Sequence, residues 1–157
     1  MLIEIPFGME GLVFQCPMPF GRHDLYRQVF QEMQGAGVDT VVVLATIGDV
    51  AENCSLDLFD LYQRNNMDII HFPIKDYSVP DKAALDETLD RVIELVKQGK
   101  RVAVHCHAGC GRTGMFLVEL AKKVKRISGA EALSWIRLYV GCAVEGSAQE
   151  SFVLGKD

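Results

Sequence analysis

Three short runs rich in β-branched residues constrain the fold of this chain more than any other feature. The runs are V-D-T-V-V-V-L-A over 38–45, Ile69–Ile74, and Arg101–Val104. The first run is typical of a strand that is buried on both faces, and the other two predict a second strand and a third, buried strand. Segments with apolar residues at helical spacing lie between the runs, so that strands and helices alternate along the chain. This alternation predicts an α/β fold with a mostly parallel central sheet flanked by helices on both faces.

Helical periodicity recurs between and after these runs. The helix expected to start at Asp81 carries an apolar stripe over 85–96, and Gly99 ends it. Ser128 and Glu131 form a capping-box pattern that opens a helix over 132–139. Further helices are expected over 24–33, from Ser55 onward, over 115–124 and over 147–154, with an edge strand over 12–15.

Length and charge exclude several classes of protein. A chain of 157 residues, 49% of them hydrophobic, fits a single domain over 1–157. No apolar run is long enough to span a bilayer, and the start of the chain lacks the pattern of a secretory signal. The net charge of −5, without an obvious basic stripe, argues against nucleic acid or a membrane as the main partner. The oligomeric state is left open.

The five cysteines are Cys16, Cys54, Cys106, Cys110 and Cys142. Because their number is odd and their spacings match no disulfide framework, we expect free thiols and a cytoplasmic location. In that compartment, a cysteine in a special setting is more often catalytic or buried than bridged.

The segment H-C-H-A-G-C-G-R-T-G runs from His105 to Gly114, between a buried strand and a helix. A glycine-rich loop that leads into a helix N-terminus turns backbone N–H groups inward and so forms an anion site. The segment lacks the Gly-Lys-Ser/Thr ending of a nucleotide P-loop. Instead it has Cys106 near its start and Arg112 six residues later.

This cysteine and arginine predict phosphoryl-transfer chemistry. N–H donors and a helix N-terminus favour the thiolate form of Cys106, which is the nucleophilic form. Arg112 can donate two hydrogen bonds to phosphoryl oxygens, and Thr113 can donate its hydroxyl to the sulfur. The loop N–H groups, the helix N-terminus and Arg112 together supply the positive charge that a metal ion would otherwise supply to a bound phosphate. We therefore expect no metal and no cofactor.

The segment resembles the signature H-C-x-x-G-x-x-R-[S/T]-G of protein tyrosine and dual-specificity phosphatases. The resemblance extends to H-F-P-I-K-D-Y-S-V-P-D, which is similar to the mobile general-acid loop of compact dual-specificity enzymes, and to C-P-M-P-F-G, which is similar to a proline-rich loop on the substrate side. The chain is therefore identified as a member of the cysteine-dependent protein tyrosine phosphatase superfamily, of the compact dual-specificity type.

The resemblance implies a role for each matching residue. Cys106 would form a phosphocysteine, Asp76 would be the general acid and base, and Thr113 would assist the second step. Gln149 would position the hydrolytic water, and His105 would support the cysteine without reacting. The residues whose N–H groups would hold the phosphoryl oxygens are His107, Ala108, Gly109, Cys110, Gly111 and Arg112.

Several alternatives remain open for single residues. Asp81 is the rival acid, although helix capping accounts for it. The cluster of His105, Cys106, His107, Cys110 and Cys142 can be read as metal ligands, but its spacing fits no ordinary zinc pattern. Cys110 is either a variable loop residue or a thiol that traps oxidised Cys106 as a disulfide. His23 and His71 are expected to be surface or partly buried structural residues.

The leading functional hypothesis is hydrolysis of phosphotyrosine, and also of phosphoserine or phosphothreonine, in a phosphorylated protein or peptide. The same chemistry on a phosphoinositide, phosphosugar or nucleotide is the first alternative. The loop has His107 and Cys110 where lipid phosphatases of the superfamily tend to have lysines. A phosphate-binding pseudophosphatase is the second alternative, and the intact Cys106, Arg112 and Asp76 argue against it. Sulfur transfer of the rhodanese type fits the full signature poorly.

Overall fold

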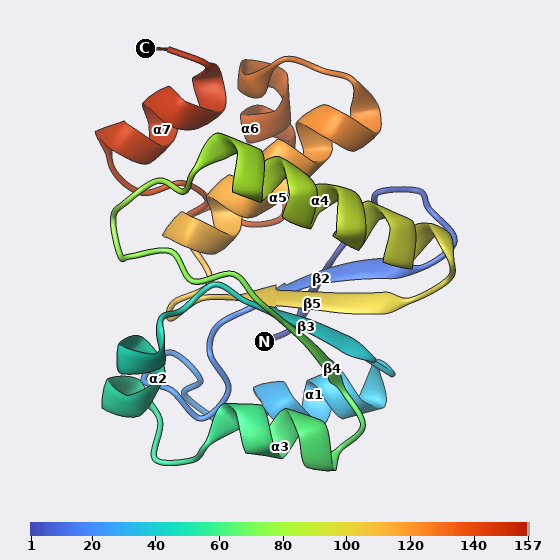
Figure 1. Ribbon diagram of the computed structural model, residues 1–157, viewed down its shortest axis with the longest axis vertical. Coiled ribbons are helices and arrows are strands. Elements are labelled where there is room, and N and C mark those ends of the chain that lie inside the picture. The colour runs from blue at the N-terminus through green and yellow to red at the C-terminus, as the bar shows by residue number, and fades with distance from the viewer. Residues whose placement is uncertain (157) are drawn as a thin grey trace.

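A five-stranded sheet forms the centre of the computed structural model, which describes residues 1–156 (Figure 1). The strand order is β1-β2-β5-β3-β4, and every neighbouring pair is parallel except β1 with β2. The strands are β1 (Ile3–Ile5), β2 (Leu12–Cys16), β3 (Thr40–Val43), β4 (Asp68–His71) and β5 (Arg101–His105). This mostly parallel sheet confirms the predicted fold class.

Helices cover both faces of the sheet (Figure 1). One face is covered by α1 (Val29–Gly35), α2 (Ile47–Asn53) and α3 (Leu58–Arg64). The other face is covered by α4 (Lys82–Lys97), α5 (Gly111–Lys125), α6 (Gly129–Arg137) and α7 (Ser147–Leu154). Two hydrophobic clusters, one on each side of the sheet, make up the core.

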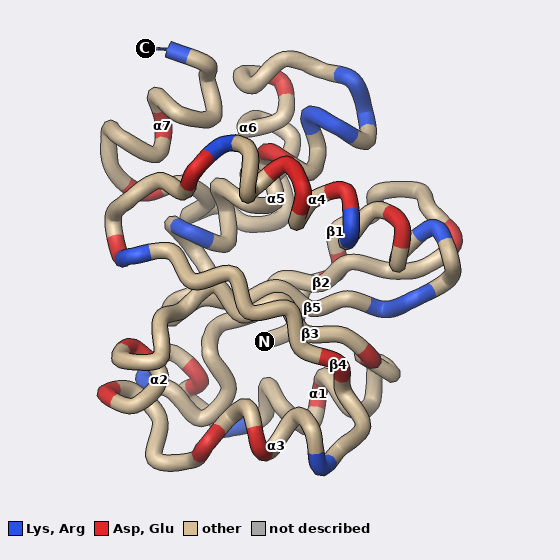
Figure 2. Tube along the Cα trace, viewed as in Figure 1, with Lys and Arg blue, Asp and Glu red and all other residues tan. Residues whose placement is uncertain are grey.

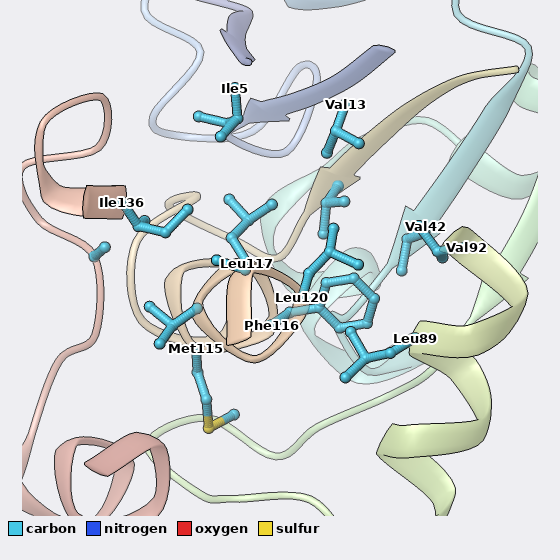
Figure 3. Packing of buried hydrophobic residues seen from close by; sticks show 14 of the residues in the cluster. Ile5, Val13, Val42, Leu89, Val92, Met115, Phe116, Leu117, Leu120 and Ile136 are labelled. Carbon is cyan, nitrogen blue, oxygen red and sulfur yellow. The ribbon is translucent and has the colours of Figure 1, made fainter. Parts of the chain in front are cut away.

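The larger cluster is centred on α5, which is buried along most of its length. Phe116 and Leu120 of α5 lie with Leu89 of α4 against the sheet residue Val42 (Figure 3). On the other side of α5, Ile136 of α6 completes the packing (Figure 3). Because both faces of α5 are packed, its N-terminus is held in a fixed place near the carboxyl end of β5.

Polar caps fix the helix ends largely as the sequence predicts. Asp81 accepts a hydrogen bond from Ala84 N at 2.9 Å and caps α4, and Ser128 forms the predicted capping box with Glu131. The cap of α3 is Asp57 and not the expected Ser55. Asp57 is placed so that its carboxylate accepts two backbone N–H groups of the first turn.

Other element bounds differ from the expectations for local reasons. The helix expected over 24–33 begins only at Val29, because the buried Asp24 carboxylate accepts the N–H groups of Phe20 and Gln28 and holds a loop in place. The strand expected over 69–74 ends at His71, before Pro73, whose nitrogen cannot donate to a ladder. The strand β1 and the helix α2 had not been expected.

Basic residues gather at the carboxyl end of α5 (Figure 2). Lys122 pairs with Glu119 at 2.7 Å, and Lys123 pairs with Asp90 at 2.6 Å. Lys125 lies over the ring of Trp135. These contacts compensate part of the positive charge at this end of α5. None of the helices over residues 1–156 is long and apolar enough to cross a membrane.

The carboxyl ends of three strands meet in one row. Cys16 of β2 and Val43 of β3 both lie opposite His105 of β5. The loops that follow these strands therefore start side by side at one edge of the sheet, where open α/β folds bind their ligands.

Candidate active site

The loop 106–110, called the phosphate loop below, connects β5 to α5. Its backbone is tied to the neighbouring strand β2 and the loop that follows it. Met18 N donates to His107 O at 2.9 Å, and Gln15 Nε2 donates to Gly109 O at 2.7 Å. Gly109 has φ of +80°, and a Cβ there would lie 2.6 Å from Cys16 O. Only glycine fits at this position, which explains one of the fixed glycines of the motif.

A pocket of about 300 Å³ opens above the phosphate loop. Its floor is the loop and the first turn of α5, and its walls come from the loops after β2, β4 and α6. The lining residues are Arg22, His23, Asp76, Tyr77, Cys106, His107, Ala108, Gly111, Arg112 and Glu145. The pocket thus contains most of the residues that the sequence predicted for phosphate binding.

Cys106 lies at the base of this pocket with 3% of its surface exposed. The preceding residue, His105, is fully buried, and burial lowers its pKa to about 4, so the ring is neutral at pH 7. Its Nδ1 lies 2.9 Å from Cys106 O, which can only accept, and therefore Nδ1 carries the proton. Nε2 then accepts from the Tyr62 hydroxyl at 2.9 Å. The ring binds the backbone of Cys106 and does not line the pocket, and the expected role of His105 as a support that does not react stays a prediction.

Arg112 is 2% exposed, and its guanidinium is held by fixed acceptors. One terminal nitrogen donates to Asp49 Oδ2 at 2.6 Å and to Ile74 O at 2.9 Å. The other lies 3.3 Å from Asp76 Oδ1. Nε of Arg112 is buried without a partner among the described residues. A buried donor in need of an acceptor, at the edge of an anion pocket, fits a phosphoryl oxygen.

Asp49 is a site residue that sequence reasoning missed. It is the N3 residue of the capping box of α2, where its carboxylate also accepts Thr46 N at 2.9 Å. Burial acts to raise the pKa of Asp49, but the hydrogen bonds from Arg112 and Thr46 outweigh it and hold the pKa below its ordinary value. The T-x-x-D pattern of the cap was a signal for the helix, although not for the contact with Arg112.

The two candidate acids lie in different settings. Asp76 lines the pocket beside Arg112, and about half of its side chain is exposed. Tyr77 follows with φ of +57°, at the tip of the loop after β4. Asp81 is occupied with the cap of α4 and does not line the pocket. Geometry therefore favours Asp76 over Asp81 as the proton donor.

Thr113 lies in the first turn of α5, and Gln149 Oε1 lies 3.0 Å from where a Cβ of Gly111 in the same turn would be. The Thr113 hydroxyl is buried and lacks a hydrogen-bond partner among the described residues, so a bond to the Cys106 sulfur stays a prediction. Gln149 is buried; its amide accepts Glu145 N at 3.1 Å and donates to Ser78 O at 3.5 Å. Gln149 does not line the pocket in this conformation, and its role as the water-positioning residue also stays a prediction.

Cys110 departs from the expectation of free thiols. It forms a disulfide with Cys142, with a Cα–Cα distance of 5.3 Å across a sequence separation of 32 residues. The expectation was wrong because the two cysteines become neighbours only when the segment after α6 folds back onto the start of α5. The bond also leaves Cys110 unable to trap oxidised Cys106 while it persists. Cys16, Cys54 and Cys106 are free and buried.

His23 and Arg22 line the pocket, although His23 was expected to be a surface or partly buried structural residue without a role in the site. The ring of His23 packs edge-on against His107 at 4.8 Å. Burial, together with the charges of His23 and Arg22, lowers the pKa of His107. Nothing in a single sequence shows that the loop after β2 folds over the phosphate loop. Over residues 1–156, no group of three His, Cys, Asp or Glu side chains is arranged to hold a metal ion.

The comparison with known families agrees with this geometry. A family model described as "Polymorphic toxin system, DSP-PTPase phosphatase" matches residues 18–122, which include the loop after β2 and the phosphate loop. The chain belongs to this DSP-PTPase family. The membership confirms the resemblance to tyrosine and dual-specificity phosphatases inferred from the motif.

The chain is also similar to individual curated proteins. The chain is 27% identical over 107 residues to mouse Cyclin-dependent kinase inhibitor 3, covering 68% of this chain and 51% of the relative. It is 36% identical over 85 residues to mouse Dual specificity protein phosphatase CDC14B, covering 54% of this chain and 16% of the relative. The chain thus spans about half or less of the length of the curated relatives it matches.

Solved structures share the fold of this DSP-PTPase. Kinase associated phosphatase, with its catalytic cysteine replaced by serine, superposes with a TM-score of 0.87 at 20% identity, covering 98% of this chain and 91% of that one. At this identity the likeness shows the fold alone, and it confirms the parallel-dominated architecture.

Proposed function

We propose that this DSP-PTPase removes phosphate from phosphotyrosine, and from phosphoserine and phosphothreonine, in phosphorylated proteins through a phosphocysteine on Cys106. The observation that carries the proposal is the convergence of Cys106, the buried Arg112 and Asp76 on one pocket. No metal or cofactor takes part in the proposed reaction. The similarity to mouse Dual specificity protein phosphatase CDC14B supports a protein substrate.

In the first step, the Cys106 thiolate attacks phosphorus opposite the leaving oxygen. A sulfur–phosphorus bond forms while the phosphorus–oxygen bond to the substrate breaks. Asp76 gives its proton to the departing oxygen, which would otherwise leave as a basic phenolate or alkoxide. The N–H groups of the phosphate loop and the Arg112 guanidinium hold the three other oxygens and favour the charge that develops there.

In the second step, water attacks the phosphocysteine. Asp76, now a carboxylate, takes a proton from that water, and the sulfur leaves as a thiolate. Thr113 donates its buried hydroxyl to the leaving sulfur, which would give that hydroxyl the partner it lacks. Gln149 would need to release Ser78 O to orient the water.

The exposure of Asp76 in the pocket wall suits a loop that closes over bound substrate. In this structure the Asp76 carboxylate pairs with Arg112, the group that the proposal assigns to the phosphoryl oxygens. Substrate would therefore displace Asp76 from Arg112 and free it to face the leaving oxygen. We also propose a cytoplasmic location. The Cys110–Cys142 disulfide would there be exposed to the thiol reductants of that compartment.

A substrate panel tests the proposal. Wild-type protein should hydrolyse phosphotyrosine peptides faster than phosphoserine and phosphothreonine peptides, with EDTA present throughout. The Cys106→Ser variant should be inactive while it retains its far-UV circular dichroism spectrum, because an alcohol is a poor nucleophile at neutral pH. A large preference for phosphoinositides, phosphosugars or nucleotides over every phosphopeptide would refute the protein substrate. Full activity in Cys106→Ser would refute the mechanism.

A further inference from the structure

A covalent bond between the phosphate loop and a distant segment has no part in the mechanism above. Cys110 is the residue that precedes α5, and Cys142 lies in the connection between α6 and α7. The disulfide joins these two segments. The bond therefore acts directly on the loop that is proposed to bind phosphate, and not on a remote part of the core.

Apart from the bond between His105 Nδ1 and Cys106 O, the hydrogen bonds that hold the phosphate loop from other segments come from one side. Met18 N and Gln15 Nε2 bind the carbonyls of His107 and Gly109 from the side of β2. From the side of residues 141–146, no hydrogen bond reaches the loop anywhere in the described part of the chain. The disulfide therefore provides the bond between the phosphate loop and the segment 141–146, and it joins the loop at Cys110.

The segment 141–146, which carries Cys142, needs to be held. Val144 has φ of +68°, a conformation that is costly for a β-branched residue and persists only where the surroundings enforce it. Arg137 donates to Ala143 O at 3.1 Å and to Val144 O at 3.5 Å. The disulfide adds a covalent restraint directly before these residues.

The same segment contributes to the pocket. Glu145 lines it, and the Glu145 carboxylate lies 3.0 Å from where a Cβ of Gly111 would be. Ala143 Cα and Val144 N each lie 2.6 Å from where a Cβ of Gly114 would be. If the segment moves away, the first turn of α5 and the N–H groups at the end of the phosphate loop lose their support.

We propose that Cys142, through its disulfide to Cys110, is a positioning residue that holds the phosphate loop in the geometry that binds phosphate. Reduction of the bond loosens the loop, weakens phosphate binding and leaves the fold intact. The inference rests on the phosphatase function proposed above. A thiol reductant usually protects a catalytic cysteine from oxidation. Here, reduction of the disulfide should instead weaken phosphate binding.

The reduction itself is ordinary thiol–disulfide exchange. Cys142 is exposed and Cys110 is half-buried, so a dithiol has access to the Cys142 sulfur. The dithiol supplies two electrons and two protons, the sulfur–sulfur bond breaks, two cysteine thiols form, and the dithiol closes into a cyclic disulfide. Cys106 has no part in the exchange.

Thiol counting under denaturing, non-reducing conditions tests the bond first. The sequence has five cysteines, of which three are free in the structure, so alkylation should label three before and five after reduction. Five labelled cysteines before reduction, in protein purified without reductant, would overturn the proposal.

Binding of inorganic phosphate then tests the positioning role without turnover. Calorimetry should give a dissociation constant for phosphate about three- to tenfold larger in reduced than in oxidised wild type, comparable to the loss of one hydrogen bond. The KM for an aryl phosphate should rise in parallel, and kcat should change less than about twofold, because the loop binds phosphate in both ground and transition states. A purely structural role would lower the melting temperature without this change.

The variants separate the disulfide from other thiols. Cys142→Ser, and Cys142→Ala if the first folds poorly, should match reduced wild type with or without dithiol. Cys54→Ser, which removes a free thiol outside the disulfide, should respond to dithiol as wild type does. Equal phosphate affinity in oxidised wild type, reduced wild type and Cys142→Ser would overturn the proposal, as would tighter binding after reduction. If phosphate binding shows the predicted change but no phosphoester is hydrolysed, the proposed function fails and the positioning role stands.

Discussion

Replacement of Asp49 by asparagine should impair catalysis although Asp49 is not expected to touch the substrate. Asp49 Oδ2 accepts the 2.6 Å hydrogen bond that fixes one side of the Arg112 guanidinium. Asparagine keeps the size and the oxygen that caps α2, but it removes the negative charge. A hydrogen bond to a charged group contributes about 1.5–3 kcal/mol. If that energy orients Arg112 for the transition state, kcat/KM should fall about 10- to 100-fold.

Steady-state kinetics with an aryl phosphate measures this effect. The matched control is Asp60→Asn, which breaks an exposed pair with Arg64 on α3 and should change kcat/KM less than twofold. Thermal unfolding of both variants shows whether Asp49→Asn is folded at the assay temperature. A folded Asp49→Asn variant with wild-type kcat/KM would refute the idea that Asp49 positions Arg112, since Ile74 O would then suffice as the anchor.

Asp76→Asn should slow hydrolysis of an alkyl or tyrosyl phosphate about 10²- to 10⁴-fold and that of an activated aryl phosphate much less, because only poor leaving groups need the proton; rate constants for a leaving-group series measure this. Gly114→Ala should lower the free energy of unfolding by about 1–3 kcal/mol in urea titrations, because its Cβ would lie 2.6 Å from Ala143 Cα, whereas Gly141→Ala meets open space. The free energy of unfolding should fall by up to about 3 kcal/mol as the pH drops from about 6.5 to 4. The reason is that His105 takes up a proton in the unfolded chain but not in the folded one, where burial lowers its pKa to about 4. Urea titrations across this pH range measure the change in the free energy of unfolding.

Each of these predictions has an outcome that contradicts it. A leaving-group effect in Asp81→Asn and not in Asp76→Asn would make Asp81 the acid. An equal free energy of unfolding for Gly114→Ala and Gly141→Ala would show that the segment after α6 moves aside for the added Cβ without loss of stability. A flat stability profile between pH 6.5 and 4 would mean that His105 accepts a proton in the folded state, against its complete burial.

The sequence was most informative where local pattern and local chemistry coincide. The first and third runs became β3 and β5, which are buried and have no polar alternation to maintain, and the second run became the edge strand β4. The caps at Asp81 and Ser128 act through backbone N–H groups a few residues away, so a short stretch of sequence contains all the information. The phosphate-loop signature was readable for the same reason, since its strand, glycines and helix are contiguous.

Features formed by distant segments could not be predicted. Asp49 meets Arg112 across a sequence separation of 63 residues, and Cys142 meets Cys110 across 32. Each contact depends on how loops leave neighbouring strands or fold back onto α5, which propensities do not record. His23 was assigned a structural role because nothing in its local sequence indicates that its loop crosses the pocket mouth. The error on the disulfide came from judging cysteine spacing without the fold.

The most direct test of the proposed mechanism is the covalent intermediate. Wild-type protein is mixed with a phosphotyrosine peptide or an aryl phosphate, quenched in acid within the first turnover, digested and analysed by mass spectrometry. The account predicts one phosphate on the peptide that contains Cys106, attached through sulfur, and none in Cys106→Ser. Rapid turnover without any phosphate on Cys106, or with phosphate on another residue, would contradict the central claim.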